Sequence, residues 1–293
     1  MDNKKITLVY NHSIKHFVGQ CNAIAAEIEK KGYEAEVFTN GELIMRKKLP
    51  EGRKCIFYDK DIPLGMRFEL QGVRLFNSIG AIEACGDKCR SYELLKELPQ
   101  PKTEIYPKTF FADEDFFAMY SQFIADELGL PVVAKLADGS QGREVFLLET
   151  VESITDFQRK YYAHAHLYQE FIAESRGKDI RIFVIGDEVY ASMLRYNPND
   201  FRSNIAIGGT AEKYEINNEI KDICISATRL MGLDFAGLDI LLGKDGKPYI
   251  CEVNSNALFT ALSQVCQVNI SEGIASHVID TKTDFFNDVG LFL

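Results

Sequence analysis

"GLDILLGKDGKPYICEVNSN" (Gly237–Asn256) bears most directly on how this chain folds, because it reads as a β-hairpin with two apolar arms. Asp245-Gly246 is a strong signal for a two-residue type I′ turn, since that turn needs φ > 0 at both central residues. A turn there sets Asp239 directly across from Glu252. Like charges in a cross-strand pair destabilise a sheet, so the stretch raises the question of what compensates these two carboxylates.

The same register places Ile240 opposite Cys251, and period-two geometry puts Asp239, Glu252 and Asn254 on one face of the hairpin. An ionised, partly buried pair of carboxylates needs a positive partner. Two carboxylates and an amide oxygen suit Mg²⁺, which takes a few carboxylates together with substrate phosphates. The alternatives are a solvated face or a carboxylate neutralised by a local lysine, and the pattern alone leaves them open.

A second segment, "KLADGSQGRE" (Lys135–Glu144), joins two apolar arms through a glycine-rich loop. Gly139 and Gly142 bracket Ser140-Gln141, and glycines let backbone N–H groups approach an anion closely. Lys135 itself stands in an otherwise apolar strand. The segment is neither a Walker A motif nor a G-x-G-x-x-G dinucleotide fingerprint. A phosphate-binding loop therefore competes here with an ordinary hairpin loop.

A third segment, "NPNDFRSNIAIGGT" (Asn197–Thr210), has no hydrophobic periodicity. It gathers Arg202, Ser203 and Asn204 ahead of Gly208-Gly209. A planar guanidinium beside amide donors suits a phosphate or a developing oxyanion. Read in isolation, the segment fits a solvated loop better.

Composition limits the classes of protein to which the chain can belong. It has 293 residues, of which 46% are hydrophobic, enough for a large core in one domain or a few small ones. The net charge of −10 argues against nucleic-acid and membrane-surface partners, because both attract basic faces. Without an 18-residue apolar run or an apolar N-terminal stretch, we expect a cytoplasmic protein with its seven cysteines reduced. His12 and His16 lack a third metal ligand, and their role stays open.

Strand and helix patterns alternate up to about Cys85, where this first unit is expected to end. Short apolar strands are predicted at Ile6–Tyr10, Glu34–Phe38, Cys55–Asp59 and Val73–Asn77, and an amphipathic helix ends at Gly32. The alternation predicts a parallel sheet and an α/β class. Further along, hairpins predominate, including one with a type II′ turn at Gly186-Asp187.

The order of these signals is more specific than any one of them. Lys88 in "GDKCRSYELL" precedes Lys135 and its glycine-rich loop, then "QEFIAESRGKDIR", "DFRSNIAIGG" and "GLDILL…CEVNSN". This order resembles the ATP-grasp superfamily, in detail the RimK-type glutamate ligases and their relatives, which include carrier-protein amino acid ligases. The resemblance covers roughly Val73 to Phe259. It implies an ATP-grasp fold preceded by a small α/β parallel-sheet domain, with domains at 1–87, 88–166 (glycine-rich loop) and 167–293 (metal site).

The resemblance also implies residue roles. Residues implied to bind ATP are Lys88, Lys135, the loop Gly139, Ser140, Gln141 and Gly142, the hinge residues Glu170 and Phe171, Asp179, and Arg202, Ser203 and Asn204 on the γ-phosphate side. Asp239, Glu252 and Asn254 would hold two Mg²⁺ ions, with Mn²⁺ as the alternative ion. Arg202 and Arg195 would stabilise charge during the reaction.

A carboxylate–amine ligase is the activity that the resemblance implies. A carboxylate would attack ATP to give an acyl phosphate and ADP, and an amine would then displace phosphate to form an amide. The expected substrates are an amino acid and a peptide, carrier protein or small metabolite, and a homodimer or homotetramer is expected. The competing interpretations are an ATP-grasp small-molecule kinase and a catalytically silent nucleotide-binding module.

One departure concerns the acceptor substrate. After "EVN", glutamate-adding relatives often continue with Ser-Pro-Gly, whereas this chain continues with Ser255-Asn256 and "ALFTAL". The choice of acceptor therefore depends on this stretch and on residues 1–72, the part of the chain that the resemblance covers least.

Overall fold

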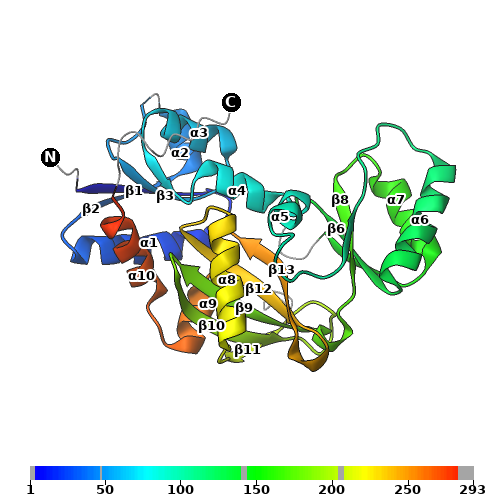
Figure 1. Cartoon of the computed structure of the whole chain (residues 1–293). Coiled ribbons are helices and arrows are strands. Elements are labelled where there is room, and N and C mark those ends of the chain that lie inside the picture. The colour runs from blue at the N-terminus through cyan, green and yellow to red at the C-terminus, as the bar shows by residue number, and fades with distance from the viewer. Residues whose placement is uncertain (1–3, 47, 140–143, 204–207, 283–293) are drawn as a thin grey trace.

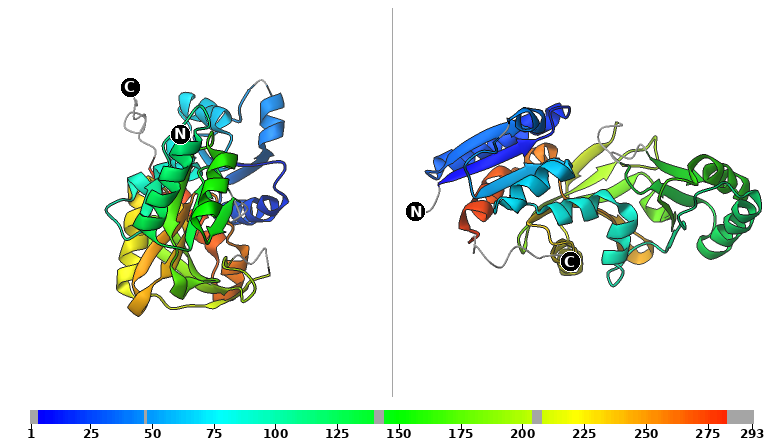
Figure 2. Two further views of the ribbon diagram at one scale, coloured as in Figure 1. Left: turned by 90° about the vertical axis from the view of Figure 1, so that its right-hand side faces the viewer. Right: turned by 90° about the horizontal axis from the view of Figure 1, so that it is seen from above.

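The computed structural model describes residues 4–46, 48–139, 144–203 and 208–282. Within these ranges the chain forms three sheets, each built from one continuous stretch of sequence. Figure 1 shows the first sheet at the upper left, the second in the lobe at the right, and the third below and between them. The views in Figure 2 show that the lobe extends away from the other two parts. The predicted mixed α/β class is confirmed.

The N-terminal sheet is parallel, with strand order β2-β1-β3-β4. Its elements are β1 (Lys5–Tyr10), α1 (Lys15–Lys30), β2 (Glu34–Thr39), α2 (Asn40–Met45), β3 (Lys54–Tyr58), α3 (Ile62–Leu70), β4 (Arg74–Phe76) and α4 (Ile79–Gly86). Side-chain oxygens of Thr39, Asp61 and Ser78 accept backbone N–H bonds and so begin α2, α3 and α4. In this order the chain passes from β1 outward to β2 and from β3 outward to β4, so the connections after β1 and β3 lead toward opposite edges of the sheet.

The second sheet is antiparallel, with order β5-β8-β6-β7. This part of the chain comprises α5 (Lys88–Leu94), β5 (Thr103–Ile105), α6 (Glu114–Leu128), β6 (Val132–Leu136), β7 (Val145–Leu148), α7 (Val151–Tyr161) and β8 (His166–Glu170). Aromatic side chains of α6 and α7 pack on one face around buried Phe117 and Tyr168. The other face is left for the cleft described below. The domain boundaries at 87/88 and 166/167 stay predictions.

The third sheet is antiparallel, with order β11-β10-β9-β12-β13. Its elements are η1 (Ala173–Ser175), β9 (Lys178–Ile185), β10 (Glu188–Tyr196), β11 (Thr210–Lys213), α8 (Asn218–Leu230), β12 (Phe235–Leu242), η3 (Lys244–Gly246), β13 (Pro248–Asn254), α9 (Thr260–Cys266) and α10 (Ile270–Asp280). Alternation along β9 buries Ile180 and Ile182 in the core beneath α8. Asp179 and Arg181, which alternate with these isoleucines along β9, therefore face the opposite side of the sheet.

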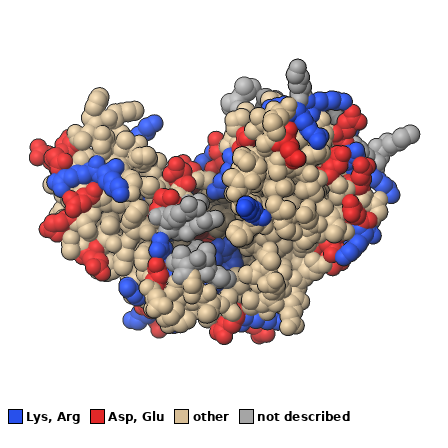
Figure 3. All heavy atoms as spheres, turned by 180° about the vertical axis from the view of Figure 1, so that it is seen from behind, with Lys and Arg blue, Asp and Glu red and all other residues tan. Residues whose placement is uncertain are grey.

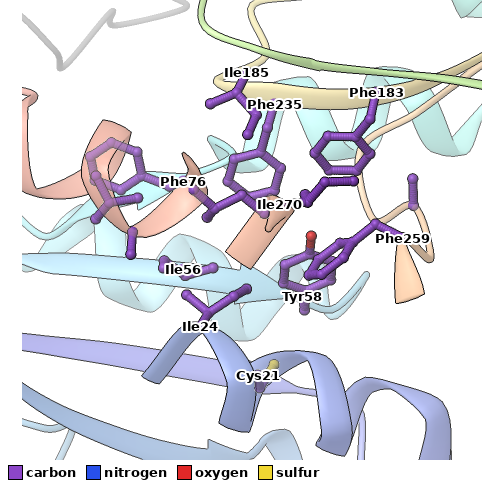
Figure 4. Packing of buried hydrophobic residues seen from close by; sticks show 14 of the residues in the cluster. Cys21, Ile24, Ile56, Tyr58, Phe76, Phe183, Ile185, Phe235, Phe259 and Ile270 are labelled. Carbon is purple, nitrogen blue, oxygen red and sulfur yellow. The ribbon is translucent and has the colours of Figure 1, made fainter. Parts of the chain in front are cut away.

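A shared core joins the N-terminal sheet to the third sheet. Tyr58, at the end of β3, stacks on Phe235 of β12 with ring centroids 5.7 Å apart and also contacts Phe259. Figure 4 shows these rings packed with Ile24 of α1 and Ile270 of α10. The carboxyl end of the parallel sheet is thereby held against the segment that follows β13. Among the described residues, no helix is both long and apolar enough to cross a membrane.

Candidate active site

A cleft lies between the second and third sheets. It has an empty volume of about 880 Å³, and Figure 3 shows the hollow between the lobe and the body of the molecule. Its walls come from β6, β7 and β8 on one side and from β9, β12 and β13 on the other. Lys88, at the first position of α5, also reaches into it.

Most of the predicted site residues meet in this cleft. Those that line it are Lys88, Lys135, Gly139, Glu170, Phe171, Asp179, Arg202, Ser203, Asp239 and Glu252. Ser140, Gln141, Gly142 and Asn204 lie outside the described residues. Arg195 and Asn254 do not line the cleft, although Arg195 contacts two residues that do. Residues from five distant stretches of sequence thus converge on one space.

The β12–β13 hairpin confirms the predicted pairing of Asp239 with Glu252 but corrects the register near the turn. Ile240 pairs with Ile250 rather than with Cys251, because next to the turn Leu242 pairs with Pro248, one residue off the predicted register. A β-bulge with Cys251 as the extra residue then restores the predicted pairing of Asp239 with Glu252. The turn itself has φ > 0 at Asp245 (57°) and at Gly246 (77°), as predicted. The bulge brings two consecutive side chains, Cys251 and Glu252, to the cleft.

The carboxylate of Asp239 is compensated in this structure by two arginines. Arg181 lies directly across from it on β9, with Nε 2.6 Å from Oδ1 and Nη2 2.9 Å from Oδ2. Arg195 Nη2 lies 2.9 Å from Asp239 Oδ1. The prediction considered only a metal ion or a local lysine for this role. The sequence analysis did not predict Arg181 as a site residue. Strand alternation could have identified it, because Arg181 is two residues from Asp179 and lies on the same face of β9.

Arg195 also pairs with Asp179 across the β9–β10 ladder, with Nε 2.6 Å from Oδ1. Burial raises the pKa of the Asp179 carboxyl and the charge of Asp239 acts in the same direction, while Arg195 opposes both. Burial alone would lower the pKa of Arg195, but the charges of Asp239 and Asp179 outweigh it and leave that pKa above its ordinary value. Arg195 is therefore a buried counter-ion of Asp179 and Asp239, and its catalytic role stays a prediction.

Two lysines face these acidic residues. Lys88 Nζ donates a hydrogen bond to the Gly139 carbonyl oxygen and lies 3.8 Å from Glu252 Oε1. Burial lowers the pKa of Lys88, and Lys135 and Lys60 lower it further, whereas Glu252 raises it. Lys135 is 8% exposed, and its Nζ lies 3.6 Å from Cys251 Sγ. Such a concentration of positive charge in a cleft suits a polyanionic ligand such as a nucleotide triphosphate.

Arg202 approaches the cleft from the segment after β10. Its Nη2 lies 2.8 Å from Asp200 Oδ2, so this guanidinium already has an anionic partner. Ser203 is buried and its hydroxyl bonds to Asp179. A γ-phosphate contact by Arg202, as predicted, would therefore compete with the Asp200 pair.

The residues present fit a magnesium ion. A carboxylate offers about four lone-pair positions, and at Asp239 Arg181 Nη2 donates a hydrogen bond to Oδ2, while Oδ1 has close ionic contacts but no hydrogen bond among the described residues. This carboxylate can therefore also bind a metal. Among the described residues, the ion pair of Glu252 is the 3.8 Å contact with Lys88, and its side chain is 34% exposed. No group of three His, Cys, Asp or Glu side chains suited to a metal occurs among the described residues, so substrate phosphates and an amide would have to complete the shell. Asn254 pairs with Gly237, and this pair lies two residues along each strand from the Asp239–Glu252 pair.

Residues 85–278 match the RimK-like ATP-grasp domain. The chain belongs to the RimK-like ATP-grasp family. Human N-acetylaspartylglutamate synthase A is 33% identical over 225 residues, which are 75% of this chain and 56% of that protein. The chain thus spans little more than half the length of the first curated relatives. A probable alpha-L-glutamate ligase 1 of Shewanella sp. (strain W3-18-1) is 34% identical over 282 residues, or 87% of this chain and 89% of that protein.

Solved structures show that the chain has the ATP-grasp fold. The ATP-grasp ligase PsnB in complex with a phosphomimetic variant of its minimal precursor, Mg and ADP superposes with a TM-score of 0.69 at 21% identity, covering 94% of this chain and 97% of that one. D-alanine–D-alanine ligase from Bacillus anthracis in complex with ATP gives a TM-score of 0.71 at 16% identity, covering 94% and 96%. The family and the fold implied by the sequence resemblance are both confirmed.

Proposed function

We propose that this chain is an ATP-dependent carboxylate–amine ligase that forms an amide through an acyl phosphate and releases ADP and phosphate. One observation carries the proposal: Lys88 and Lys135 face the Asp239–Glu252 pair across a single cleft. This is the charge arrangement that phosphoryl transfer requires, because such a reaction depends on neutralising phosphate oxygens more than on covalent help from the protein.

In the first step a substrate carboxylate oxygen forms a bond to the γ-phosphorus of ATP, while the bond from that phosphorus to the ADP oxygen breaks. Lys88 and Lys135 bind the phosphate oxygens from one wall of the cleft. Asp239 and Glu252 on the other wall, with Asn254 further along the same hairpin, are the residues that would hold magnesium, and the bound ion would supply further positive charge to the phosphates. Arg195 acts on this step indirectly, by orienting Asp239.

In the second step the amine nitrogen forms a bond to the acyl carbon, the bond from that carbon to the phosphate oxygen breaks, and a proton leaves the nitrogen for solvent. The tetrahedral intermediate carries an oxyanion, which a preorganised cation stabilises. Arg202 is the candidate for this role, and it must exchange its pair with Asp200 for the substrate. Lys88, Lys135, Asp239 and Glu252 are all present in the cleft, which favours an active enzyme over a silent module.

An amino acid is the proposed amine, joined to a peptide, a protein or a small metabolite. L-Glutamate is the first to test, because the relatives named above carry glutamate in their names. Peptide carboxylates also merit testing, because PsnB was solved with its precursor. We also propose that the protein works in the cytoplasm and forms a dimer or tetramer. Light scattering would test the oligomeric state.

The deciding experiment measures ADP release from ATP and Mg²⁺ with L-glutamate paired with N-acetyl-L-aspartate, citrate or a glutamate-ended peptide. A ligase releases ADP only when carboxylate and amine are both present, and hydroxylamine in place of the amine gives a hydroxamate. A kinase instead releases ADP with one substrate and leaves a stable phosphorylated product. ATP binding without ADP release in every arm would show a silent module.

A further inference from the structure

A second polar site lies at the carboxyl end of the N-terminal sheet. In open α/β sheets, ligands bind outside the carboxyl ends of the strands, at the point where neighbouring connections diverge. Here that point lies between β1 and β3, because the chain leaves β1 toward β2 and leaves β3 toward β4. Asn11 follows β1 and Asp59 follows β3, and Asn11 Nδ2 donates to Asp59 Oδ1 over 3.0 Å.

Asp59 is only 2% exposed, yet half of its carboxylate has no partner. Oδ1 accepts bonds from Asn11 Nδ2 and from the backbone N–H groups of Lys60 and Asp61. Oδ2 is buried and has no hydrogen-bond partner among the described residues. A buried charged oxygen without a partner is costly, so its presence calls for a ligand that supplies donors.

Two more buried oxygens without a described partner belong to the segment that follows β13. They are Ser255 Oγ and Asn256 Oδ1, and Asn256 Nδ2 donates to the backbone oxygen of Asp59 over 2.9 Å. Asn77 Nδ2 fixes the same segment by donating to the Ser255 carbonyl. The segment that departs from the common Ser-Pro-Gly continuation is therefore bound to the carboxyl end of β3.

We propose that Asp59, Ser255 and Asn256 form the subsite for the ammonium group of the amine substrate, an inference that rests on the ligase function proposed above. Three oxygens of these side chains are unused, one of them on a carboxylate, and an ammonium group offers three N–H donors and one positive charge. Charge-assisted hydrogen bonds of this kind are about twice as strong as neutral ones. A buried water would satisfy the same oxygens but leave the carboxylate charge uncompensated.

The subsite lies close to the predicted reaction centre. Asn256 is four residues beyond Glu252, a separation of at most ~14 Å even in a fully extended chain. Lys60, directly after Asp59, is near enough to Lys88 to lower its pKa. An ammonium group held by Asp59 thus enters from the side of the cleft that carries Glu252 and Lys88, and it loses one proton to solvent before its nitrogen attacks the acyl carbon.

Calorimetric binding of free amino acids, with L-glutamate first, tests the subsite without any turnover. We expect at least one free amino acid to bind the wild type, and its N-acetyl derivative, which has no ammonium group, not to bind. Asp59→Asn should weaken binding roughly 10-fold or more, because it removes the charge and replaces an acceptor with a donor. Asp61→Asn is the matched control, since asparagine also caps α3, and its affinity should equal that of the wild type.

Hydroxylamine separates this proposal from the ligase function. It is small and needs no ammonium subsite, so Asp59→Asn should still form hydroxamate at the wild-type rate while its KM for the amino acid rises and its KM for ATP does not. If Asp59→Asn is unstable in thermal melts, Asn256→Ala replaces it with the same expected loss. Equal binding by wild type and variant, equal binding of the N-acetyl derivative, or no binding of any amine would overturn the subsite. Binding that depends on Asp59 without ADP release in any arm would retain the subsite and reject the ligase.

Discussion

Arg181 and Asp239 lie opposite each other on β9 and β12, with Nε 2.6 Å from Oδ1, and both side chains are nearly buried. This pair explains how a hairpin can place Asp239 beside Glu252 without unfolding. Arg195 adds a second guanidinium and Asp179 a second carboxylate, so four charges alternate in sign at the floor of the cleft. Within the described part of the cleft, Glu252 has a more distant ion-pair partner, Lys88 at 3.8 Å, than Asp239 or Asp179 has, which leaves it more available to a metal.

Arg195→Met should destabilise the protein by about 3–5 kcal/mol, because it leaves the buried Asp179 and part of Asp239 uncompensated. Urea unfolding followed by circular dichroism measures the change. Arg229→Met is the matched control: its pair with Asp187 is exposed on both sides and should contribute little to stability. Equal losses in the two variants would contradict the buried network.

Glu252→Gln should abolish amine-dependent ADP formation and leave the fold intact, since the side chain is one-third exposed and makes only a 3.8 Å contact with Lys88. The readouts are a coupled ADP assay and Mn²⁺ binding by electron paramagnetic resonance in the presence of a non-hydrolysable ATP analogue. Glu212→Gln, on the exposed edge strand β11, should behave as the wild type. Near-normal turnover and metal binding in Glu252→Gln would remove Glu252 from the metal site.

Lys135→Ala should raise the KM for ATP roughly 10- to 100-fold, the effect of losing one hydrogen bond between charged groups. Steady-state kinetics at saturating amine and carboxylate give this value. Lys96→Ala removes an exposed lysine at the end of α5 and should change nothing. If ATP dependence is unchanged in Lys135→Ala, this lysine does not contact the nucleotide.

The activity should decrease at alkaline pH, and this decrease should begin below the pH at which an ordinary lysine loses its proton. Burial lowers the pKa of Lys88, so its charged form is lost before the usual lysine range near about 10.4 is reached. Lys60→Ala should move this alkaline limb of kcat/KM for ATP to higher pH, because the charge of Lys60 lowers the pKa of Lys88. A limb that moves to lower pH, or does not move, would show that another group titrates.

Part of the site was predictable because strand alternation, turn residues and the order of the motifs can be read directly from the sequence. Counting from the turn at Asp245-Gly246 paired Asp239 with Glu252 but placed Ile240 wrongly, because the strands pair one residue off that count next to the turn and the bulge at Cys251 cancels the difference. A bulge adds one residue without any composition signal, and a register counted from the turn cannot detect it. The parallel first sheet followed from the alternation of apolar strands with helices.

The sequence by itself determined the family, the parallel sheet and ten of the residues that line the cleft, because local periodicity and motif order are written along the chain. Only the tertiary structure decided what compensates Asp239. Arg181 is 58 residues away in sequence and becomes its partner when β9 pairs with β12. The same holds for Asp59 and Asn256, which meet only because the core around Tyr58 packs the first sheet against the third. Such contacts depend on long-range strand pairing and on the packing of layers, and local sequence patterns specify neither of these.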